Sequence, residues 1–455
     1  MNYSAPLLLA LCIGAAFGCQ APQLSTTKSA NNSESNTPKY LLSLNDVAIL
    51  VPFKANADFI KAAPRIDEIP DPSTHAPGLS AAPADGEAFV PAWALTQVST
   101  LLKSDEDLRE SEEFQFGGDG FDVETEASIT KFAPEDDSGY RLVSLRIDPC
   151  ANPVNAGLDD TKCVRQLRLI FQEIGIKGRF FASDNNVHAI YQVTDDEMKA
   201  IAETLRSIAK NAQMDLSKEP LLPHPVLSKE GPQGDYYKGV LSIIHRFARA
   251  SKLTHLAFFA DVNGGRQGHW PMLQFAIKDG KPLPMAILQA EQAEGEAPKF
   301  VQRQDGGQGG LLSPSPASVS PDTIFPEFAM GRPHGSQADF DTWWAKVDAI
   351  KWGRTFAVEH PIRHDPTSLD CASCHNAFQE RRTVTERAES KGTMASLVVP
   401  LDAFKSDHFN LSIHIPVNFD LTSLQMFSYF RRDEKITQRV VNDAAVSADY
   451  LNEKF

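Results

Sequence analysis

A pair of cysteines followed by a histidine, Cys371-Ala-Ser-Cys374-His375, has the most definite chemistry in this 455-residue sequence. A C-x-x-C-H string is typical of covalent haem attachment, because two thiols at this spacing reach the vinyl groups of the porphyrin and the adjacent imidazole can bind the iron. A zinc site would need a second Cys/His pair, and no cysteine follows Cys374. A thioredoxin-like dithiol would begin a helix after a strand, whereas Asp365-Pro-Thr-Ser368 predicts a loop. We therefore predict one haem c, attached at Cys371 and Cys374, with His375 as the proximal ligand.

With these residues and the upstream stretch Phe356-Ala-Val-Glu-His360-Pro-Ile-Arg-His364, the sequence locally resembles a c-type cytochrome. The resemblance implies electron transfer to a redox partner protein. It also implies candidates for the sixth iron ligand: His364 or His360, as in multihaem cytochromes, or a downstream methionine, with Met426 ahead of Met394. An open sixth position is the remaining possibility. The haem propionates need cationic or indole donors, and the candidates that flank the motif are Arg354, Arg363, Arg381, Arg382, Trp343, Trp344 and Trp352.

The N-terminus has the features of an export signal. Residues 5–17 are apolar, of signal-peptide length, and are followed by Gly18-Cys19 and a polar stretch. This resembles a bacterial lipoprotein signal, which implies that Cys19 carries a lipid and anchors the mature protein to a bilayer. An ordinary cleaved signal peptide is the alternative. Both interpretations predict a protein of the bacterial cell envelope, either periplasmic or anchored to the outer membrane.

The remaining pair, Cys150 and Cys163, encloses a loop rich in turn-forming residues between two strand-like runs, 140–147 and 164–171. In an oxidising compartment such a pair is typical of a disulfide that closes a hairpin. Two metal ligands are the alternative, but no nearby His or Cys would complete the site.

Composition limits the other possible functions. The formal net charge of −15 argues against nucleic acid as a partner. No apolar run approaches the roughly 18 residues of a membrane-spanning helix. The chain also lacks a G-x-S-x-G, H-E-x-x-H or P-loop motif. The histidines at 245, 255 and 269 are scattered and favour structural roles.

The order of predicted elements indicates an α+β fold, with mixed, mostly antiparallel sheets in a large N-terminal region and a mainly helical or irregular C-terminal haem-binding segment. Thr194 and Glu197 form a capping box for a helix, and Asn263-Gly264 and Asp279-Gly280 predict hairpin turns. Residues 340–350 and about 433–451 also favour helices. The expected organisation is a signal peptide at 1–18, a disordered tether at 19–39, an α+β region at 40–303 with a possible break near 216–234, a Gly/Ser/Pro linker at 304–322 and a haem c-binding region at 323–455.

These observations favour an exported electron carrier with one haem. Two alternatives stay open: a haem enzyme or small-ligand sensor with an open distal face, and an envelope interaction module that carries a haem. The long region before the motif, which exceeds what electron transfer requires, keeps both alternatives in consideration.

Overall fold

The fold was analysed in a computed structural model. The structure describes residues 41–71, 86–97, 139–152, 160–176, 180–212, 214–216, 219–259, 269–285, 301–306, 312–315, 330–331, 333–365, 368–406, 408–411 and 424–455. Cys19, the export signal, the tether and the Asn263-Gly264 turn lie outside these ranges. All described residues belong to one compact unit, Tyr40–Phe455.

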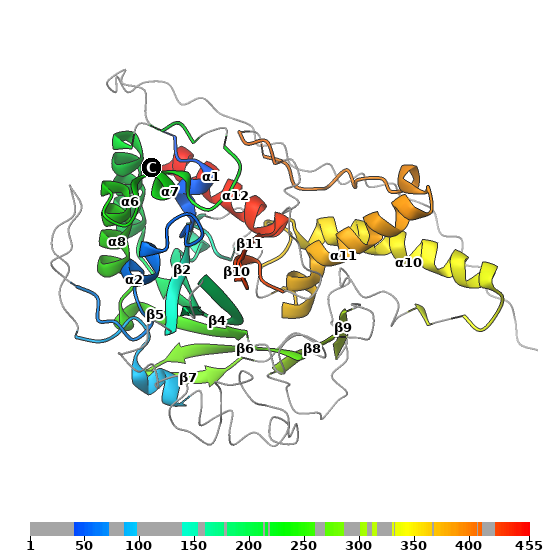
Figure 1. Ribbon diagram of the computed structural model, residues 1–455, viewed down its shortest axis with the longest axis horizontal. Helices are drawn as coiled ribbons and strands as arrows, with labels where there is room; N and C mark the ends of the chain where they lie inside the picture. The colour runs from blue at the N-terminus through cyan, green and yellow to red at the C-terminus, as the bar shows by residue number, and fades with distance from the viewer. Residues whose placement is uncertain are drawn as a thin grey trace, which may run out of the picture. The chain divides into compact units, whose positions relative to one another are not determined.

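A nine-stranded sheet forms the centre of this unit (Figure 1). Its strands run in the order β1-β2-β3-β4-β5-β6-β8-β9, with β7 paired to β6, and every pair is antiparallel. A separate hairpin joins β10 to β11. The strands are β1 (Ala48–Leu50), β2 (Gly139–Asp148), β3 (Gln166–Ile176), β4 (Phe180–Gln192), β5 (Leu253–Phe259), β6 (His269–Lys278), β7 (Lys281–Pro284), β8 (Val301–Gly306), β9 (Leu312–Ser315), β10 (Phe427–Phe430) and β11 (Asp433–Ile436).

Helices precede, interrupt and follow the strands along the chain, so the expected α+β class with a mostly antiparallel sheet is confirmed. In Figure 1, α6 and α8 lie on one side of strands β2–β5 and α11 lies on the other, while the C-terminal end of α12 reaches α6, where Arg206 donates to the carbonyl of Leu451. The α-helices are α1 (Leu44–Val47), α2 (Asp58–Ala62), α6 (Asp195–Asn211), α7 (Pro225–Glu230), α8 (Asp235–Phe247), α10 (Gln337–Val358), α11 (Cys371–Ser390) and α12 (Gln438–Lys454).

The two faces of the sheet differ in character. Successive side chains of a strand point to opposite faces, and on one face of β2–β4 they are apolar and buried in the same core as α6 and α8, for example Leu145, Leu169 and Val187. On the other face the alternating positions include Arg146, Arg168 and His188. The second face therefore has the polar groups that a site could use.

Several local expectations are confirmed. Cys150 and Cys163 form a disulfide that closes the β2–β3 hairpin. Thr194 and Glu197 cap α6 reciprocally. Asp279 and Gly280 connect β6 to β7 with φ angles of 50° and 69°, as an Asp-Gly hairpin turn requires.

Other boundaries differ from expectation. The C-terminal helix begins at Gln438 rather than near 433, because residues 427–436 form the β10–β11 hairpin, whose turn places Arg431 at φ 57°. The helix expected at 340–350 extends over Gln337–Val358. The range 304–322, expected as a linker, contains the end of β8 and all of β9, which pair with each other in the sheet.

Candidate functional site

The C-x-x-C-H motif opens helix α11. Asp370 is the N-cap, and its carboxylate accepts a hydrogen bond of 2.8 Å from the backbone N–H of Ser373. The helix thus begins with its first turn held in place, and Cys371 and Cys374, three residues apart, lie on the same side of that turn. The two cysteines are not bonded to each other.

Both thiols line a cavity rather than the outer surface. Burial raises the pKa of Cys371 to about 12 and also raises the pKa of Cys374. The amide of Gln274 donates a hydrogen bond of 3.3 Å to the Cys371 sulfur. Reactive dithiols depend on a lowered thiol pKa, so this environment disfavours the thioredoxin-like alternative.

The ring of His375 is oriented by one backbone group. Its Nδ1 lies 2.8 Å from the carbonyl oxygen of Leu424. Because a carbonyl oxygen can only accept, Nδ1 carries the proton and Nε2 carries the lone pair. Burial lowers the pKa of His375, which keeps the ring neutral at physiological pH. A neutral imidazole whose other nitrogen donates to a carbonyl is the usual state of a metal-binding histidine.

The segment that contains Leu424 is itself held on the polar face of the sheet. Asn186 on β4 donates to the side chain of Gln425 over 2.5 Å. Ser144 on β2 donates to the carbonyl of Phe427 over 2.7 Å. Gln172 on β3 exchanges hydrogen bonds with the backbone of Tyr429. The N-terminal sheet therefore positions the group that orients the histidine of the C-terminal motif.

The cavity itself has a volume of about 330 Å³, within the range of about 300–1,000 Å³ that is common for cofactor and ligand sites. Strands β2–β6 supply one part of its wall, and the start of α11, the loop before it, residues 425–428 and α12 supply the rest. The lining contains both apolar residues, such as Ile170, Met272 and Leu369, and charged ones. This mixture fits a flat apolar ring that carries acidic substituents.

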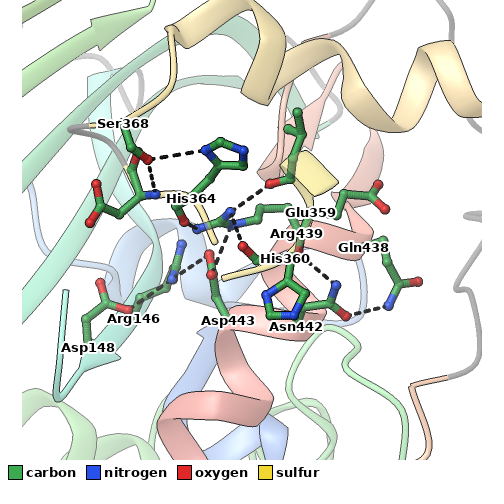
Figure 2. Close-up of polar contacts among 12 residues, drawn as sticks. Arg146, Asp148, Glu359, His360, His364, Ser368, Gln438, Arg439, Asn442 and Asp443 are labelled. Carbon is green, nitrogen blue, oxygen red and sulfur yellow. Dashed lines mark hydrogen bonds and ion pairs between the residues drawn. The ribbon is translucent and has the colours of Figure 1, made fainter. Parts of the chain in front are cut away.

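Three arginines and two aspartates form a charged network in the cavity wall, of which Figure 2 shows Arg146, Arg439, Asp148 and Asp443. Arg146 lies 3.0 Å from both Asp148 and Asp443, and Arg439 lies 3.0 Å from Asp443. Burial opposes ionisation of Asp443, but the charges of Arg439 and Arg146 outweigh it and lower its pKa. The network thus contains three arginines and two aspartates. Two further carboxylates, Asp365 and Asp370, line the cavity near α11.

Arg168 is the least satisfied cation of this network. Its Nε lies 3.7 Å from Asp148, beyond hydrogen-bond distance, and has no hydrogen-bond partner among the described residues. Burial lowers the pKa of Arg168. A buried guanidinium N–H without an acceptor costs free energy, so an anionic group of a ligand would be stabilised here.

Only some of the haem ligands predicted from the sequence line the cavity. Cys371, Cys374 and His375 share the cavity with His364 and Met426. His360 is not part of the cavity lining; its ring stacks edge-on against Phe404 at 5.2 Å. Met394 lies in an exposed 3-10 turn. The candidates that flank the motif for the propionates also lie outside the lining: Arg354, Arg363, Arg381, Arg382, Trp343, Trp344 and Trp352.

Sequence reasoning missed the residues that the sheet contributes. Arg146, Arg168 and His188 line the cavity, as does His255, for which we expected a structural role. The available signal was alternation, because each of the first three lies between two apolar residues of a strand. Alternation alone does not say which segment covers the polar face.

Comparisons with known proteins found no matching family model, no matching curated protein and no matching solved structure. Within the described ranges, no helix is long and apolar enough to cross a membrane. Nor do the described residues include three or more His, Cys, Asp or Glu side chains grouped to hold a metal ion. A haem iron takes its equatorial ligands from the porphyrin and needs only axial ligands from the protein.

Proposed function

We propose that this chain is an exported c-type cytochrome that transfers electrons through one covalently attached haem. The observation that carries the proposal is the environment of the motif: the two thiols and His375 share one cavity, and the Nδ1–H of His375 donates to the Leu424 carbonyl. Such a histidine is prepared to bind iron through Nε2.

In this proposal Cys371 and Cys374 would hold the porphyrin through thioether bonds, and His375 would bind the iron. Arg168, which has a buried N–H without an acceptor, would hold a propionate. When bound, the haem supplies an iron that gains and loses a single electron.

The compartment follows from the same chemistry. Haem is attached to C-x-x-C-H outside the cytoplasm, and the Cys150–Cys163 disulfide suits an oxidising compartment. We infer a periplasmic or outer-membrane-anchored lipoprotein, held to the lipid bilayer through Cys19, with a redox protein as its partner and no role for nucleic acid.

The test is to express the full chain in a bacterial host that has c-type haem-attachment machinery. We expect a Soret band that stays with the protein after acid–acetone extraction and a mass increase of one haem. Replacing both Cys371 and Cys374 with Ala should abolish both signals, while the matched control, Cys150→Ser with Cys163→Ser, should keep the haem. A wild-type protein without covalent haem would overturn the proposal.

A further inference from the structure

His188 occupies the centre of the polar face that lines the cavity. In the sheet register it pairs with Ile170 of β3 and Ala257 of β5. Its neighbours Val187 and Ala189 are buried in the core on the opposite face, so the imidazole of His188 points to the cavity. It lines that cavity together with Cys371, Cys374 and His375.

The chemical state of His188 suits a metal ligand. Burial, followed by the charges of Arg168, His375 and Arg146, lowers its pKa well below the ordinary value. The ring is therefore neutral and has a nitrogen lone pair. Among the residues that the structure describes, no side chain or backbone group forms a hydrogen bond with the His188 ring.

The other candidates are placed less well. Met426 follows closely after Leu424, which orients His375, and its side chain packs against the main core. His364 stands in the loop that leads into the motif, and its Nδ1 lies 3.3 Å from Ser368 Oγ. Both belong to the C-terminal walls that also contain the motif, whereas His188 comes from the sheet.

The second cavity histidine on the sheet, His255, differs from His188 in the hydrogen bonding of its ring. Its Nδ1 lies 3.1 Å from the hydroxyl of Thr254, and its pKa is lowered by burial and by the charge of Arg168. His255 therefore makes a matched control for His188, on a neighbouring strand and in the same cavity.

On the basis of the function proposed above, we propose that His188 is the second axial ligand of the haem iron, opposite His375. The large N-terminal region then has a defined part in the site. Its sheet supplies one axial ligand and, through Asn186, Ser144 and Gln172, holds the segment that orients the other. Ligation by an imidazole from each side leaves the iron without an open position, which suits electron transfer rather than ligand binding.

The experiment uses the full-length, haem-loaded protein and the variants His188→Ala, His364→Ala, Met426→Leu and His255→Ala. Covalent haem content is measured first for each variant, because this measurement tests the proposed function separately. The coordination state is then read from the ferric spin state and from CO binding to the ferrous protein. Circular dichroism checks that each variant is folded.

We expect the wild type to be low-spin and to bind no CO. His188→Ala should become high-spin and bind CO stoichiometrically, and added imidazole should restore the low-spin spectrum. The other three variants should behave like the wild type. A second variant, His188→Met, should keep six ligands but show the near-infrared charge-transfer band of methionine ligation, which is informative even if the alanine variant folds poorly.

The inference is overturned if His188→Ala stays low-spin and unreactive to CO with a full complement of haem. It is also overturned if only His364→Ala or Met426→Leu makes the ferric iron high-spin and lets the ferrous iron bind CO. Rapid CO binding by the wild type would exclude His188 as a ligand and favour the open-face enzyme or sensor, while covalent haem in that same sample would leave the haem attachment intact.

Discussion

Replacing Arg439 with Met should destabilise the protein through the contacts that join α12 to the chain ahead of the motif. The guanidinium is buried and donates hydrogen bonds to the backbone carbonyls of Val358 at 2.8 Å, His360 at 3.4 Å and His364 at 2.6 Å. It also pairs with Asp443 at 3.0 Å. Figure 2 shows these contacts converging on one side chain. Methionine keeps most of the length and apolar volume but makes none of them.

The expected cost follows from these contacts. A hydrogen bond to a charged group contributes about 1.5–3 kcal/mol, and breaking a buried ion pair costs about 3–5 kcal/mol. Asp443 retains Arg146 as a second partner at 3.0 Å, so its charge is not left unpaired. We therefore expect a loss of about 3–4 kcal/mol in the free energy of unfolding. This is less than the sum of these terms, because interactions made by one side chain are not additive.

Urea unfolding followed by circular dichroism measures this loss, with the m-value checked for constancy. Arg382→Ala is the control, because Arg382 pairs with Glu386 on the exposed side of α11 and should change stability by about 0.5 kcal/mol or less. A second check is the double variant Arg439→Met with Asp443→Leu, whose cost should be smaller than the sum of the single variants. A loss below about 1 kcal/mol for Arg439→Met, similar to the control, would refute the reasoning.

Two further predictions concern stability. Replacing Cys150 and Cys163 with Ser should lower the free energy of unfolding by about 3 kcal/mol, since the bridge closes a loop with a sequence separation of 13; identical urea midpoints for the variant and the oxidised wild type would contradict this. His224 is buried, and burial lowers its pKa from 6.5 to about 3. As the pH falls, the unfolded state therefore binds a proton on His224 at a higher pH than the folded state does. The free energy of unfolding should decrease as the pH drops from about 6.5 towards 3, with a slope of up to about 1.4 kcal/mol per pH unit from this group. The variant His224→Asn keeps an acceptor for the backbone N–H of Leu227. It should remove the contribution of His224 to the pH dependence of the free energy of unfolding. Equal pH dependence in the two proteins would contradict a buried, neutral His224 ring.

The sequence by itself was sufficient for features that depend on neighbouring residues. The capping box of α6, the Asp-Gly turn and the disulfide-closed hairpin are all confirmed, because each is decided by residues close together in the chain. The α+β class with an antiparallel sheet also follows from the order of local patterns. The C-x-x-C-H motif is local in the same sense, and the haem attachment that residues 371–375 predict stays a prediction.

The rest of the candidate site was decided only by the tertiary structure. Arg146, Arg168 and His188 come from three strands, and Arg439 comes from the last helix. Period-two alternation places a side chain on one face of a strand, but the strand register and the segment packed on that face decide which groups meet. The orientation of His375 likewise depends on a backbone carbonyl at Leu424, a group that every residue has and that no sequence pattern distinguishes. The sequence thus predicted a chemistry for the motif from neighbouring residues, and the fold decided which side chains surround it.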